Sequence, residues 1–137
     1  MVLLIDTNIV LDFLLKREPF YDDAKRIIKM CCGESVHGCI ALHTITNMWY
    51  ILRKVPDDMR RITLKSICEL LEVIGTTHEE VVNALEMTEF MDFEDCIQSK
   101  CAKSFGADFI ITRNQSDFAH SEIPVLSPKE ILEKMEG

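Results

Sequence analysis

Long apolar runs and glycine-rich loops are missing from this sequence. No stretch approaches the ~20 apolar residues of a membrane helix, so we expect no membrane span. The 5 glycines are scattered and form neither G-x-G-x-x-G nor a P-loop, which argues against a nucleotide cofactor. The opening residues MVLLID lack the basic leader and the small-residue cleavage site of a secretion signal, so a cytoplasmic location is predicted.

Regularly spaced ligands of the zinc type are missing as well. The 6 cysteines form no C-x-x-C pair, whereas zinc sites and disulfide frameworks usually show paired spacings. We interpret them as buried, reduced thiols that pack as small hydrophobic side chains. The 4 histidines show no H-x-x-x-H or H-E-x-x-H spacing, which disfavours a zinc hydrolase.

A basic excess is also absent, because 23 acidic residues outweigh 15 basic ones and the net charge is −8. This balance argues against a protein that coats duplex nucleic acid by neutralising phosphates. It leaves room for an enzyme acting on nucleic acid, since a carboxylate cluster adds negative charge and the cation that it holds supplies the positive charge. The length of 137 residues and a hydrophobic fraction of 47% suit one domain over 1–137.

Short apolar runs alternate with helical periodicity, a pattern typical of βαβ construction and an α/β fold. Strands are predicted at 2–5, 35–41, 107–112 and 125–126. Residues 73–74 are either a further short strand or the end of a helix. Helices are predicted at 9–15, 20–32, 45–55, 59–74, 79–87 and 92–105, and from 128 onwards, where Ser127 and Glu130 form a capping box.

Polar side chains follow two of the predicted strands. Asp6 comes directly after the first strand, and Asn114 and Asp117 follow the strand at 107–112. Ligands of open parallel sheets bind at the carboxyl ends of the strands, so these side chains are candidates for one shared crevice. The alternative for each acid alone is that it caps the helix or turn that follows it.

Three acids, Asp92, Glu94 and Asp95, crowd the start of the predicted helix 92–105. A spacing of three residues places Asp92 and Asp95 on one side of the first turn. Capping and compensation of the helix dipole explain part of this cluster, but three acids in four residues exceed what capping needs. Crowded carboxylates repel unless a cation sits between them, and Mg²⁺ or Mn²⁺ prefers oxygen ligands.

A basic zone surrounds the predicted turn at position 56. An RNA-backbone track and an ordinary exposed hairpin both fit this zone. Its members are Arg53, Lys54, Arg60, Arg61 and Lys65.

Four segments together resemble the PIN domain over essentially the whole chain. LIDTNIVLDFLL resembles its opening motif, ALHTITNMWYILRK its second, DFEDCIQSKCAKSFGADFIITRNQSDF its third and fourth, and IPVLSPKEIL its closing strand and helix. The DFED segment with TRN-x-x-DF resembles the branch associated with bacterial VapC-like toxins. The resemblance implies a Rossmann-like parallel sheet of four to five strands flanked by helices.

Matched position by position, the resemblance assigns the acids of the site. Asp6 matches the first acid of the family, Asp95 the third, Asp117 the acid before the Phe of the fourth motif, and Asp92 an additional acid of the DFED branch. We expect all four to be catalytic. Asp6, Asp95 and Asp117 are the expected ligands of Mg²⁺ or Mn²⁺, directly or through water.

One position departs from the family pattern, because the second motif ordinarily carries Glu and this chain has Asn47. The site thereby loses one carboxylate, although the amide oxygen of Asn47 can still accept a bond from a metal-bound water. Asp92 is the candidate to supply the missing carboxylate. The residues expected to support the site or contact substrate are Thr7, Asn47, Thr112, Arg113 and Asn114.

The function implied by the resemblance is divalent-metal-dependent hydrolysis of RNA by the toxin component of a toxin–antitoxin pair. Its implied partners are an RNA substrate, an antitoxin protein and a second copy in a homodimer. The alternative is a catalytically weakened PIN-fold module that binds RNA or protein, which Asn47 favours. A phosphate-accepting receiver domain is disfavoured, since the first strand is followed by Asp6 alone and not by paired acids.

Overall fold

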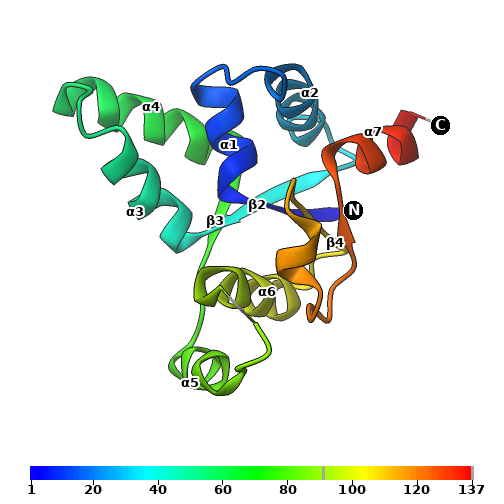
Figure 1. Ribbon diagram of the computed structural model, residues 1–137. Helices are drawn as coiled ribbons and strands as arrows, with labels where there is room; N and C mark the ends of the chain where they lie inside the picture. The colour runs from blue at the N-terminus through cyan, green and yellow to red at the C-terminus, as the bar shows by residue number, and fades with distance from the viewer. Residues whose placement is uncertain (91, 137) are drawn as a thin grey trace.

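The computed structural model describes residues 1–90 and 92–136, and these form a five-stranded parallel sheet with helices on both faces (Figure 1). The strands are β1 (Val2–Ile5), β2 (His37–Ala41), β3 (Glu72–Ile74), β4 (Phe109–Ile111) and β5 (Val125–Leu126). The helices are α1 (Thr7–Leu14), α2 (Tyr21–Cys31), α3 (Leu42–Ile51), α4 (Asp57–Leu70), α5 (His78–Glu86), α6 (Phe93–Phe105) and α7 (Pro128–Glu136), with a 3₁₀ turn η1 (Gln115–Phe118). None of the helices described is long and apolar enough to cross a membrane.

Alternation of side chains along β1 separates two hydrophobic cores. Leu3 and Ile5 point to the face covered by α1, α2, α4 and α7, while Leu4 points to the face covered by α5 and α6. Figure 1 shows α1, α2 and α7 on one side of the sheet and α5 and α6 on the other. All three side chains are fully buried, as expected for a parallel sheet with both faces covered.

The order of the strands is β3-β2-β1-β4-β5, and neighbouring strands are parallel. The chain therefore moves outward in one direction from β1 to β3 and resumes on the other side of β1 with β4. The reversal point lies between β1 and β4, where open α/β sheets bind ligands. The Asp6 N–H donates to the Ile111 carbonyl at 3.0 Å, so the pairing of the two strands extends to this point.

Most predicted elements are confirmed, and of the two alternatives for residues 73–74 the short strand is the one that forms. Helix α4 ends at Leu70, and Glu72–Ile74 form strand β3 beside β2. Val73 and Ile74 pair with Ile40 and Ala41, so an open sheet edge overrides the helical periodicity. The expected capping box before α7 is present, with hydrogen bonds in both directions between Ser127 and Glu130.

The cysteines only partly match the interpretation as buried thiols. No disulfide is formed among the six, and four of them are buried while Cys32 and Cys68 are exposed. Burial raises the pKa of the Cys31 and Cys39 thiols to about 12, which keeps both protonated and inert. The expectation of burial is wrong for Cys32, which follows α2, and for Cys68, on the outer side of α4.

Candidate active site

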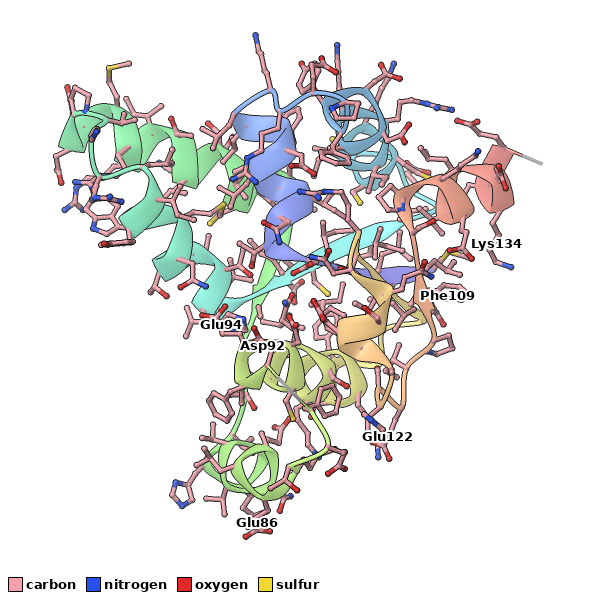
Figure 2. All side chains as sticks on the ribbon, in the orientation of Figure 1. Glu86, Asp92, Glu94, Phe109, Glu122 and Lys134 are labelled. Atoms are coloured by element: carbon pink, nitrogen blue, oxygen red, sulfur yellow. The ribbon has the colours of Figure 1, made fainter. Side chains whose placement is uncertain are left out.

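A cavity of about 440 Å³ lies at the carboxyl ends of β1 and β4, between α3 and the start of α6. Acidic and amide side chains dominate its lining, which is the composition expected at an oxygen-donor cation site. Asp92 and Glu94 lie at the start of α6, next to the first turns of α3 (Figure 2). The lining consists of Asp6, Thr7, Asn8, Leu11, Asn47, Tyr50, Ile51, Asp92, Glu94, Asp95, Gln98, Asn114 and Asp117.

Asp6 is fixed at the bottom of this cavity by two hydrogen bonds. The side chain is 4% exposed, Oδ1 accepts from Gln98 Nε2 at 2.8 Å, and Oδ2 accepts from Thr112 Oγ1 at 2.8 Å. Asp6 occupies the N-cap position of α1, yet its side chain makes no capping hydrogen bond. Capping therefore does not explain this acid, and its carboxylate joins β1, the end of β4 and α6 at one point.

Asp95 faces the other carboxylates of the cavity from the first turn of α6. Burial, followed by the negative charges of Asp92, Asp6, Asp117 and Glu94, raises the pKa of Asp95 to about 7. The four other acids therefore act on Asp95 within a partly dehydrated space. The sequence expectation that acids after two strands meet those of the DFED segment agrees with this placement.

Asp92 has a structural function as well as a place in the cavity. Its Oδ1 accepts a hydrogen bond from the Asp95 N–H at 3.2 Å, which caps α6 and helps to set the position of Asp95. The capping alternative is therefore confirmed for Asp92, while the residue also lines the cavity.

Asn47 faces the acids from α3, at the position where a Glu was expected. Its Nδ2 donates to Glu94 Oε1 at 3.2 Å, so the amide holds a carboxylate at the cavity mouth. The oxygen of the Asn47 amide is then the atom left to accept a hydrogen bond from water or substrate.

The segment after β4 brings the last two expected residues to the cavity. The Asn114 N–H donates to Thr112 Oγ1 at 3.0 Å, and the Asp117 N–H donates to the Asn114 carbonyl at 3.0 Å. Both side chains line the cavity, whereas Thr112 is fully buried behind Asp6. Thr112 thus orients a carboxylate and does not face the open space.

Two of the residues expected to support the site or contact substrate are bound to other parts of the chain. Thr7 lines the cavity, and its hydroxyl bonds with Thr44 Oγ1 at 2.8 Å. Arg113 does not line the cavity, because its guanidinium is bound by the buried carboxylate of Asp12. Of the two roles expected for Arg113, the contact with Asp12 fits support of the site rather than contact with substrate.

Sequence reasoning missed Gln98 and Asp12. Gln98 lies three residues after Asp95 on α6, so the helical spacing that links Asp92 and Asp95 also carries this amide toward the cavity. The ion pair of Asp12 spans 101 positions of sequence, and no local pattern indicates it.

Comparison with known proteins identifies the family of this chain. Residues 2–116 match the sequence pattern of the PIN domain. The chain belongs to the PIN domain family. Ribonuclease VapC1 of Aquifex aeolicus (strain VF5) is 26% identical over 134 residues, which cover 95% of this chain and 92% of that protein.

Solved structures share the fold of this PIN domain. VapBC2 from Rickettsia felis, bound to a DNA fragment from its promoter, has a TM-score of 0.68 at 17% identity and covers 93% of this chain and 98% of that one. A toxin–antitoxin complex from Klebsiella pneumoniae has a TM-score of 0.68 at 22% identity, covering 91% of this chain and 96% of that one. The predicted Rossmann-like sheet flanked by helices is confirmed.

The donor set of this PIN domain fits a hard divalent cation. The cavity lining offers carboxylate and amide oxygens and contains no thiol or imidazole. Gln98 Oε1 is buried beside Asp6 without a hydrogen-bond partner in the described part of the chain, an arrangement that a water shared with a cation would satisfy. Within 1–90 and 92–136, no three acidic, histidine or cysteine side chains converge enough to enclose an ion, so a bound cation would keep several waters.

Proposed function

We propose that this PIN domain is a divalent-metal-dependent ribonuclease that hydrolyses phosphodiester bonds of RNA and is the toxin component of a toxin–antitoxin pair. The observation that carries the proposal is that five acids line one cavity, where burial and the four neighbouring charges raise the pKa of Asp95 to about 7. Repulsion among carboxylates that share one cavity is relieved when a cation binds between them. The name Ribonuclease VapC1 of the similar protein from Aquifex aeolicus supports RNA as the substrate.

Mg²⁺ or Mn²⁺ is the proposed cofactor, with Asp6, Asp95 and Asp117 holding it directly or through water. Such a cation supplies Lewis acidity toward a phosphoryl oxygen and lowers the pKa of a coordinated water. Asp6 keeps a fixed orientation because Gln98 and Thr112 donate to its two oxygens, at 2.8 Å each. A ligand held in this way needs no reorganisation when the substrate binds.

The remaining polar groups of the cavity orient water and substrate. Asp92 positions Asp95 through its cap of α6 and adds a fourth catalytic carboxylate. The free amide oxygen of Asn47 accepts a hydrogen bond from water, and Asn114 faces substrate from the β4–η1 segment. In this proposal the chain acts in the cytoplasm as a homodimer and is inhibited by an antitoxin protein. The toxin–antitoxin complex from Klebsiella pneumoniae supports such a partner.

Incubation of the purified chain with a long single-stranded RNA tests the proposal. We expect cleavage with Mg²⁺ or Mn²⁺, none with EDTA, and a loss of at least about 100-fold in Asp95→Asn. Cleavage that persists in EDTA or in Asp95→Asn would exclude the proposed site. Metal-independent RNA binding without cleavage would instead support a catalytically weakened PIN-fold module, the second candidate, which Asn47 favours.

A further inference from the structure

An aromatic residue stands at the mouth of the acidic cavity on the same side of α3 as Asn47. Tyr50 follows Asn47 by three residues, which in a helix is a displacement of about 4.5 Å along the axis on nearly the same face. Both residues line the cavity, and Tyr50 is 65% exposed. A tyrosine combines a large apolar ring with a polar hydroxyl, a combination that is enriched at binding interfaces.

Arg53 supports the ring of Tyr50. The Arg53 guanidinium carbon lies 4.5 Å from the ring centroid, and Nη1 donates to the Tyr50 carbonyl at 3.2 Å. This contact orients the ring and places a positive charge beside it. No carboxylate lies within ion-pair distance of Arg53 or of Lys54 in the described part of the chain, so both charges remain available.

The hairpin of α3 and α4, which extends away from the sheet in Figure 1, holds this pair in a fixed geometry. Arg60 of α4 donates to the Trp49 carbonyl at 3.0 Å, and its guanidinium lies 3.7 Å from the Trp49 ring centroid. Arg60 and Arg61 also pair with Asp57. Within the basic zone around position 56, Arg60 and Arg61 are therefore bound within the hairpin, whereas Arg53 and Lys54 keep charges that are available to a ligand.

We propose that Tyr50 is a stacking platform for one base of single-stranded RNA, next to the phosphodiester that enters the acidic cavity, and that Arg53 binds the phosphate of that nucleotide. The inference rests on the proposed ribonuclease function and adds the means by which the substrate is positioned. Single-stranded RNA is recognised by stacking of bases on aromatic rings combined with basic groups along the backbone.

The chemistry of the pair favours RNA over a protein partner. An apolar protein surface on Tyr50 would remove Arg53 from water without giving its charge a partner, which is unfavourable. A nucleotide satisfies both groups, because the base covers the ring and the phosphate meets the guanidinium. Five cavity acids repel the RNA backbone, so a cationic contact directly outside them also supports the approach of the strand.

Binding of an oligoribonucleotide of about 12 nucleotides that carries 2-aminopurine tests this inference. All proteins in this experiment carry Asp95→Asn, so that the RNA stays intact, and all binding buffers contain Mg²⁺. We expect Tyr50→Ala to weaken binding about tenfold, or about 1.4 kcal/mol, and to abolish the quenching of 2-aminopurine fluorescence. Tyr50→Trp should retain both. Arg53→Ala should weaken binding and reduce the salt slope by about 0.7, the value of one phosphate on a single strand.

Matched controls are Leu85→Ala, which removes a side chain that is 64% exposed on α5, and Lys129→Ala, which removes an exposed charge on α7. Equal binding of the oligoribonucleotide by Tyr50→Ala and Leu85→Ala overturns the inference. So does a Tyr50→Ala variant that binds the oligoribonucleotide normally but no longer associates with an antitoxin or a second copy. In the native background, unchanged cleavage KM in Tyr50→Ala overturns the inference but leaves the ribonuclease intact. Absence of any RNA cleavage by the unmodified chain would overturn both the proposed ribonuclease function and the inference about Tyr50.

Discussion

Both carboxylate oxygens of Asp12 in α1 accept hydrogen bonds from the guanidinium of Arg113, Oδ2 from Nε at 2.7 Å and Oδ1 from Nη2 at 3.2 Å. Asp12 is 1% exposed, and the Arg113 guanidinium also stacks on the Phe20 ring at 3.8 Å from its centroid. Arg113 directly precedes Asn114, so the ion pair fixes the β4–η1 segment against α1. It thereby holds one wall of the cavity without facing the cavity itself.

Loss of Asp12 should destabilise the fold strongly, because the guanidinium of Arg113, whose side chain is only 23% exposed, would lose its bidentate partner. We expect Asp12→Ala to lower the free energy of unfolding by about 3–5 kcal/mol, measured by urea denaturation. Arg17→Ala serves as the control, since its contact with Asp12 spans 3.7 Å at a partly exposed position. That change should remove less than about 1 kcal/mol. Similar losses in both variants would mean that Asp12 is not held mainly by Arg113.

Asp95 should make the stability of the metal-free chain depend on pH. The pKa of Asp95 is about 7 in the fold and about 4 in an unfolded chain. Between these values the folded chain binds a proton that the unfolded chain has released, so the stability from this group falls as pH rises from about 4 through 7. Asp95→Asn should match the unmodified chain near pH 4 and exceed it by about 1 kcal/mol near pH 8, a value reduced for partial exposure.

Thermal unfolding in EDTA over this pH range measures the difference between the two proteins. Addition of Mg²⁺ should narrow the difference near pH 8, because the cation stabilises only the ionised site. A constant difference at all pH values would show that Asp95 does not titrate in this range.

Asp6 should respond to truncation in the opposite direction from Asp95. Asp6→Ala leaves the buried donors of Gln98 and Thr112 without an acceptor, and each unsatisfied donor costs about 1–3 kcal/mol. We expect the metal-free unfolding free energy to fall by about 2–4 kcal/mol, while Asp95→Ala leaves it unchanged or raises it. Chemical denaturation in EDTA checks this order. A gain of stability in Asp6→Ala would show that charge repulsion outweighs both hydrogen bonds.

The features predicted correctly from the sequence are those that depend on residues close together in the chain. The strand at 2–5 and the capping box at Ser127 depend on neighbouring residues, and both are confirmed. The end of α4 depends on whether β2 offers a free edge with which Val73 and Ile74 can pair. The periodicity of one segment carries no information about that edge.

In the site as well, positions set by neighbouring residues could be predicted, whereas contacts between distant parts of the chain could not. The places of Asp6 and Asp117 follow from their positions after strands, since strand ends meet at one edge of a parallel sheet. The partner of Arg113 follows from a contact with α1 that is far away in sequence. The sequence therefore left two roles open for Arg113, support of the site and contact with substrate, and only the distant contact with Asp12 distinguishes them.

The substitution Asn47→Glu tests how the site compensates for its departure from the family pattern. Asn47 Nδ2 donates to Glu94 Oε1 at 3.2 Å, so a Glu at this position would place two carboxylates in repulsive contact. We expect the metal-free variant to lose about 1 kcal/mol of stability. Its Mn²⁺ affinity, measured by calorimetry, should rise on the order of tenfold, because the bound cation screens the repulsion and the new carboxylate adds a ligand. Unchanged affinity would place Asn47 outside the metal site.

Asp92→Asn decides which acid replaces the missing Glu. Asn caps helices about as well as Asp, so this variant keeps the hydrogen bond to the Asp95 N–H and should fold normally. If Asp92 supplies the missing carboxylate, Asp92→Asn abolishes RNA cleavage and Asn47→Glu restores it in the double variant. Glu94→Gln is the matched control, because it removes a cavity carboxylate while Gln still accepts a hydrogen bond from Asn47. Loss of cleavage in Glu94→Gln but not in Asp92→Asn would transfer the compensating role to Glu94, the acid that Asn47 already contacts.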